Sequence, residues 1–167
     1  MMSARRLIAA GSVVWATQVG ADPACGDDGV LRFCPSVGPW AVADEVADAD
    51  MGPGGRVWIA GDDVLFVTPR ADLIDYGLTD TVESHAQTLS DLLQSAGLEP
   101  DGYWRSFPEP ATAMTAGIEE PRAVRLFTLI TLGATPYLIG SIHPPAADVT
   151  SLWQMHRDAV AAMELSQ

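Results

Sequence analysis

Residues 124–143 read VRLFTLITLGATPYLIGSIH, and this stretch decides the fold. It holds two runs rich in β-branched and aromatic side chains, residues 124–132 and 137–143, which favour strands. Residues 133–136 (GATP) form a short turn between them, so the two runs are predicted to pair as antiparallel neighbours. Two prolines, Pro144 and Pro145, end the second run. A sheet begun this way is built from neighbours in sequence rather than from βαβ units.

Further strands are predicted on either side of this pair. Residues 57–60 (VWIA) and 64–68 (VLFVT) flank Gly61-Asp62-Asp63, which is the clearest hairpin signal in the chain. Shorter strands are expected within residues 30–33, 40–46 and 103–107, whereas residues 108–120 are expected to be an irregular loop.

Two helices are predicted from apolar residues at helical spacing. Within residues 79–97 the apolar positions recur four, three, four and three residues apart, with Thr79 or Thr81 as the N-cap and Gly97 as the stop. A second helix is expected over residues 150–165, with Asp148 or Thr150 as its cap. The predicted fold class is therefore α+β: an antiparallel sheet of about five to seven strands with two main helices packed on it.

The first 21 residues have the pattern of a secretory signal. Arg5 and Arg6 precede a mostly apolar run, residues 7–16, and small side chains precede a cleavage point after Ala21. A strand is the alternative interpretation of residues 7–16. With the signal removed, residues 22–167 form a single α+β domain.

Cys25 and Cys34 are the two cysteines of the chain, and both follow the proposed cleavage point. In an exported protein an even number of cysteines indicates a disulfide. In a cytosolic protein the same two residues would be unpaired thiols. Their spacing matches neither a CxxC redox motif nor a structural zinc site, so no metal is expected.

The charge balance limits the class of partner. The chain has 22 acidic residues against 9 arginines and no lysine, and its formal net charge is −13. Such a surface repels nucleic acid and anionic lipid, and no apolar run of 18 residues indicates a membrane span. A basic protein partner suits this charge, although an acidic surface also serves solubility alone.

No strong catalytic motif is present. His85, His143 and His156 lack the local spacing of a metal site, no nucleophile elbow occurs, and Glu119-Glu120 is expected to be solvated surface. If the chain is an enzyme, the best candidates are His85 and His143 with a nearby acid. No catalytic residue is assigned and no cofactor is expected.

Aromatic residues mark the best candidate for a binding surface. In residues 103–107 (YWRSF), strand alternation places Tyr103, Arg105 and Phe107 on one face and Trp104 on the other. Exposed aromatics of this kind are enriched where proteins contact their partners. The predicted ligand or partner surface is Tyr103, Trp104, Arg105 and Phe107.

The order of elements resembles the PsbP-like fold group, which includes PsbP and the DcrB-type domains. The resemblance is carried by a strand and a proline before an aromatic residue (Phe33 to Trp40), the hairpin of residues 57–68, the helix of residues 82–96, the strand pair of residues 124–143, and a closing helix with Trp153. It implies a protein-binding module without an active site.

Three functions follow from these observations. The first is a non-catalytic binding module, exported to the envelope or periplasm, that engages a protein or a small ligand. The second is a cytosolic adaptor or secretion-effector chaperone, and the third is an enzyme of unknown type. The oligomeric state is not predicted.

Overall fold

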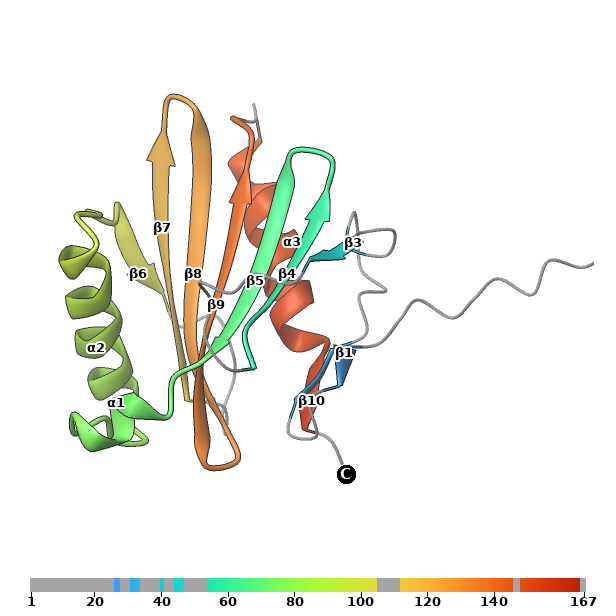
Figure 1. The fold of residues 1–167 in the computed structure, drawn as a ribbon. Coiled ribbons are helices and arrows are strands. Elements are labelled where there is room, and N and C mark those ends of the chain that lie inside the picture. The colour runs from blue at the N-terminus through green and yellow to red at the C-terminus, as the bar shows by residue number, and fades with distance from the viewer. Residues whose placement is uncertain are drawn as a thin grey trace, which may run out of the picture.

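The computed structural model describes residues 26–27, 31–33, 40, 44–46, 54–104, 112–145 and 148–165. Two antiparallel sheets and three helices make up this part of the chain (Figure 1). The elements in chain order are β1 (Gly26–Asp27), β2 (Leu31–Phe33), β3 (Asp44–Val46), β4 (Arg56–Ala60), β5 (Asp63–Pro69), α1 (Asp72–Asp75), α2 (Val82–Ser95), β6 (Gly102–Trp104), β7 (Ala113–Glu120), β8 (Ala123–Leu132), β9 (Thr135–His143), α3 (Val149–Ala161) and β10 (Met163–Leu165).

The main sheet has seven strands in the order β3-β4-β5-β9-β8-β7-β6, and each pair is antiparallel. The pair predicted from residues 124–143 is confirmed as β8 and β9, with Val124 opposite His143 and Leu132 opposite Thr135. The hairpin of β4 and β5 is confirmed too, and its turn residue Gly61 has a φ of +66°. The α+β fold class and the strand number agree with the sequence prediction.

The two long helices cover opposite faces of this sheet, which we call the α2 face and the α3 face. Strand alternation on β8 sends Phe127 and Leu129 into the cluster with α2, while Leu126 and Ile130 lie in clusters that include residues of α3. In Figure 1, α3 runs behind the strands and α2 stands at the side of β6 and β7.

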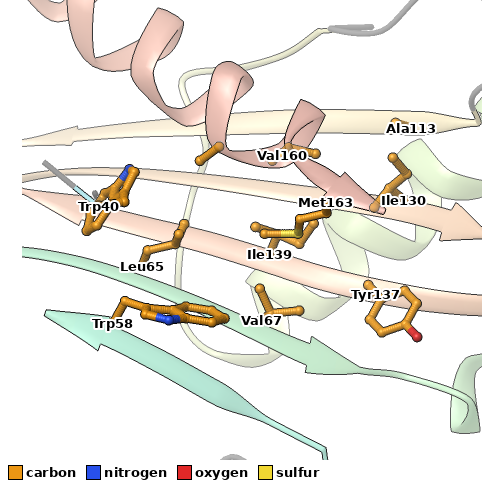
Figure 2. Packing of buried hydrophobic residues seen from close by; sticks show 11 residues of the cluster. Trp40, Trp58, Leu65, Val67, Ala113, Ile130, Tyr137, Ile139, Val160 and Met163 are labelled. Atoms are coloured by element: carbon orange, nitrogen blue, oxygen red, sulfur yellow. The ribbon is translucent and has the colours of Figure 1, made fainter. Parts of the chain in front are cut away.

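The larger apolar core lies on the α3 face. Figure 2 shows Leu65 and Ile139 of the sheet beneath Val160 and Met163, with Trp40 at one side. Trp40, Leu65 and Ile139 have no exposed surface. Burial of each large apolar side chain contributes about 1.5–3 kcal/mol, so this layer supplies much of the stability of the domain.

Helix α2 begins and ends as its sequence predicts. Its N-cap is Thr81, whose side chain accepts a hydrogen bond from the backbone N–H of Ser84 at 3.2 Å. Gly97 follows the helix with a φ of +73°, a conformation that glycine adopts without strain. The second long helix also starts as predicted, because Asp148 caps it through the N–H of Thr150.

Two parts of the sequence interpretation were wrong. Residues 113–120 are not a loop but strand β7, which pairs with β8 along its whole length. Its alanines and glycine have low strand propensity, and pairing with β8 overrides that propensity. The final helix ends at Ala161, because Met163–Leu165 form β10 and pair with β2.

No helix in the described part of the chain is long and apolar enough to cross a membrane.

Candidate functional site

Six polar side chains cross the α3 face of the sheet, and we call them the polar stripe. Five of them are at most 1% exposed, and the sixth, Asp63, opens the stripe to solvent with 24% of its side chain exposed. The members of the polar stripe are Asp63, Thr115, Thr128, Ser141, His143 and His156.

The stripe is continuous because β8 and α3 place polar residues at positions that face each other. On β8, Thr128 lies between Leu126 and Ile130, and all three face α3 by strand alternation. On α3, His156 lies one turn after Leu152 and one turn before Val160. The stripe therefore separates two apolar clusters on the same face.

The first half of the stripe contains two histidines that share one serine. Asp63 Oδ1 lies 2.7 Å from His143 Nδ1, and His143 Nε2 lies 2.8 Å from Ser141 Oγ. The same Ser141 Oγ lies 2.8 Å from His156 Nδ1. The serine hydroxyl thus connects a histidine of β9 with a histidine of α3.

The second half of the stripe runs from α3 to β7. His156 Nε2 lies 2.8 Å from Thr128 Oγ1, and Thr128 Oγ1 lies 2.8 Å from Thr115 Oγ1. Both ring nitrogens of His156 are therefore bonded although the side chain is only 1% exposed. Satisfied buried polar groups of this kind avoid the desolvation penalty of an unpaired one.

The protons of the stripe have one consistent order when both histidines are neutral. A carboxylate only accepts, so His143 Nδ1–H donates to Asp63 and His143 Nε2 accepts from the Ser141 hydroxyl. Ser141 Oγ then accepts from His156 Nδ1–H, and His156 Nε2 accepts from the Thr128 hydroxyl.

Burial and, as the smaller cause, the nearby His143 lower the pKa of His156 from 6.5 to about 3. His156 is therefore neutral at physiological pH. A neutral ring is consistent with the hydrogen-bond order given above, in which one nitrogen donates and the other accepts.

Asp63, His143 and Ser141 are connected in the order of a nucleophilic triad. A nucleophile must touch its substrate, however, and Ser141 has no exposed surface. Its oxygen is also a partner of His156 beneath α3. The arrangement supports a structural role, in which the stripe fixes α3 on the sheet, rather than acyl transfer.

The two histidines proposed for catalysis lie on opposite faces of the sheet. His143 belongs to the stripe, whereas His85 of α2 bonds on the other face to the Thr81 carbonyl through Nδ1 (2.9 Å) and to Thr131 Oγ1 through Nε2 (2.8 Å). His85 thereby ties the first turn of α2 to β8. The structure does not bring the two histidines together in one site.

Sequence reasoning missed the stripe, although a signal for it exists. Ser141 and His143 stand two apart in a strand that is otherwise apolar on the same face, and Thr128 interrupts the apolar positions of β8. Among the residues with described positions, no three His, Cys, Asp or Glu side chains are grouped to hold a metal ion. Glu119 is exposed, and Glu120 forms an ion pair with Arg125 at 3.0 Å.

A second candidate site is the β6 edge, which we define as Gly102–Trp104 at one end of the sheet order. Trp104 is 44% exposed and Tyr103 is 36% exposed. The Trp104 ring contacts Trp153 of α3 edge-on, with 4.5 Å between centroids and an interplanar angle of 73°. Such aromatic pairs are worth about 0.5–1.5 kcal/mol beyond burial, so Trp104 is held although it is exposed.

Glycines under the two indoles make this arrangement possible. Gly102 and Gly117 are opposite each other on β6 and β7. A Cβ on Gly117 would overlap the Trp153 ring, and one on Gly102 would lie 2.8 Å from Trp104 Cζ2. Trp104 and Trp153 therefore pack directly on the backbone of Gly102 and Gly117, which we call the tryptophan floor.

Tyr103 lies on the α2 face, opposite to Trp104 as alternation predicts, and lines an open pocket of about 500 Å³ beside the end of α2. Ser90 and Gln94 of α2 form one wall, and the turn at residues 97–100 forms the other. The structure thus places Tyr103 and Trp104 at one edge of the sheet on its two faces. Arg105 and Phe107, the other predicted surface residues, lie outside the described residues, as do residues 1–21 and both Cys25 and Cys34.

The comparisons with known proteins give a similarity at the level of a solved structure. No family model matches the chain, and no curated protein matches it. The chain is similar to the Saccharomyces cerevisiae Ran-binding protein Mog1p at 13% sequence identity, with a TM-score of 0.46 over 74% of this chain and 95% of the other.

Proposed function

We propose that this chain is a non-catalytic binding module that engages a protein partner through the β6 edge. The observation that carries the proposal is the 44% exposure of Trp104, whose ring is fixed against Trp153. Tryptophan and tyrosine dominate the energetics of protein contacts. A side chain that is already held loses little freedom on binding, so more of its contact energy appears as affinity.

The geometry of the edge favours a protein over a small ligand. In the described part of the chain, β6 pairs with β7 on one side and with no strand on the other. An extended peptide that added beside β6 would meet Trp104 on one face and Tyr103 on the other. Strand addition of this kind takes affinity from main-chain hydrogen bonds and specificity from alternate side chains.

The cellular setting is proposed from the sequence pattern. We propose that the chain belongs to the PsbP-like group, that residues 1–21 are a cleaved signal, and that Cys25 and Cys34 form a disulfide in the envelope or periplasm. The intact mass from the native host, with and without thiol alkylation, tests this. A full-length chain with two alkylated thiols would instead support the cytosolic adaptor.

The binding proposal is tested by capture from the native host with matched variants. Trp104→Ser and Tyr103→Ser are expected to lose a partner that the unaltered chain retains. Ile59→Ser is the control, because Ile59 is exposed to a similar extent (38%) on β4, away from β6 in the sheet order. Thermal unfolding of all three variants checks that they are folded. Equal capture by Trp104→Ser and by the control would refute the proposal.

A further inference from the structure

Residues 71–101, which we call the α2 layer, carry charge of one sign only. Residues 71–101 contain seven acidic residues and no arginine or lysine, and all seven acidic side chains are exposed. They fold as α1, α2 and the approach to β6. Within the described chain, Asp72 is the one of the seven that forms an ion pair, with Arg70 at 2.8 Å. The other six have no arginine or lysine partner among the described residues, so the field over this layer is negative.

An apolar anchor point lies at the α1 end of the same layer. Ile74 is 50% exposed and Tyr76 is 84% exposed, which makes Tyr76 the most exposed large apolar side chain in the described chain. Ile74, Leu78 and Pro136 line a pocket of about 210 Å³, and Asp80 stands in its wall. We call this the α1 pocket. Its volume suits one aliphatic side chain.

The α1 pocket is held by a fixed backbone. Gly77 N–H bonds to the Ile74 carbonyl at 3.0 Å, and Leu78 N–H bonds to the Leu73 carbonyl at 2.9 Å. Leu73 itself is 4% exposed and packs in the cluster under α2. Beneath the opposite wall, His85 accepts from the hydroxyl of Thr131, which also lines the pocket. The turn that presents Tyr76 is thus anchored at both ends.

The α1 pocket and the β6 edge lie at the two ends of α2, and one partner can reach both. The 14 residues of α2 span about 21 Å, a distance that about six or seven extended residues cover. Glu83 and Asp91 lie exposed between the two ends, eight residues apart and so on one side of the helix.

We propose that the exposed surface of the α2 layer binds a basic segment of the protein partner. One aliphatic side chain of the segment would enter the α1 pocket, and its arginine or lysine side chains would lie beside Asp75 and Asp80. This inference rests on the proposed function and names the chemistry of the partner. Charge complementarity selects the occupant, because an acidic or neutral segment would gain nothing from these carboxylates. The exposed Tyr76 ring offers a further face to a cation.

The test uses two labelled peptides and the full chain. The first peptide has four arginines around a central leucine, and the second has alanine in place of the leucine. Fluorescence anisotropy at low salt is expected to show about tenfold tighter binding of the leucine peptide, since the pocket buries its side chain. Ile74→Ser is expected to abolish that difference while the alanine peptide binds as before.

Charge is tested with matched pairs of neutralised acids. Asp75→Asn with Asp80→Asn is expected to weaken the leucine peptide about fivefold. The control is Asp62→Asn with Glu119→Gln, which removes the same charge in the β4–β5 turn and on β7 next to the β7–β8 turn. Both turns lie at the end of the sheet away from α1 (Figure 1), so the control is expected to change little. Equal weakening by both pairs would mean nonspecific attraction and would overturn the inference, as would equal affinity for the two peptides.

This inference can fail while the proposed function of the β6 edge stands. If the host partner is lost by Trp104→Ser but kept by Asp75→Asn with Asp80→Asn, the proposed function stands and this inference fails.

Discussion

The neutral, buried His156 makes the stability of the domain depend on pH in a way that one substitution can isolate. Its folded pKa is lowered to about 3, whereas the unfolded chain has the ordinary value of 6.5. Below pH 6.5 the unfolded state therefore binds a proton that the folded state does not take up. The free energy of unfolding is complete above pH 6.5 and falls as the pH drops toward 3.

The size of the effect follows from the two pKa values. Each pH unit between them contributes about 1.4 kcal/mol, so at pH 5 the loss from His156 alone is about 2 kcal/mol. His156→Gln keeps a donor and an acceptor for Ser141 and Thr128 but does not titrate. We expect the variant to be less stable than the unaltered protein at pH 8 and to lose about 2 kcal/mol less on transfer to pH 5.

Urea unfolding at a series of pH values measures this difference. Carboxylates titrate in both proteins, so the difference between the two curves cancels their contribution and isolates His156. The urea dependence should be the same in both, which checks that the unfolded states are comparable. Parallel curves from pH 8 to pH 5 would refute the burial argument, and a variant that loses more stability than the unaltered protein would reverse its sign.

Three further predictions concern the polar stripe and the tryptophan floor. Ser141→Ala should lower the free energy of unfolding by about 1–3 kcal/mol, because His156 Nδ1–H loses its acceptor; a change below about 0.5 kcal/mol would contradict the bond. Long-range ¹H–¹⁵N spectra at pH 7 should show His156 as the Nδ1–H tautomer, and an Nε2–H signal would contradict the proton order. Gly117→Ala should cost about 1–3 kcal/mol and displace Trp153, with a red-shifted tryptophan emission as Trp104 loses its support; unchanged emission would argue against the contact.

Local patterns predicted the parts of the fold whose signals lie in adjacent residues. The strands β8 and β9 and the hairpin of β4 and β5 follow from β-branched runs around turn residues, and the cap of α2 at Thr81 follows from local hydrogen bonding. Strand β7 was missed for a physical reason. Small residues are needed there because of the side chains that pack on the strand: Gly117 leaves room for the Trp153 ring. That requirement cannot be seen in the sequence of the strand itself.

The two candidate sites also differ in how much of each could be read from the sequence. Tyr103 and Trp104 are exposed, and their role as a partner surface stays a prediction. Polar positions on β8 and β9 are visible in the sequence, but the contacts within the polar stripe were not predictable, because His143 and Asp63 are 80 residues apart and meet only once β5 and β9 pair. Single histidines in a sequence carry no information about which strand will lie beside them.

The polar stripe also determines where an exposed side chain points. A helix that contacts a sheet only through leucine and alanine can slide by one turn and still bury apolar surface. Here such a shift would leave the nitrogens of His156 against apolar side chains such as Leu126 or Ile130. The stripe therefore allows α3 a single longitudinal position. Trp153 lies three residues before His156, so the same alignment sets its indole over Gly117 and against Trp104. The registration of a buried hydrogen-bond chain thus fixes the orientation of an aromatic ring at the molecular surface.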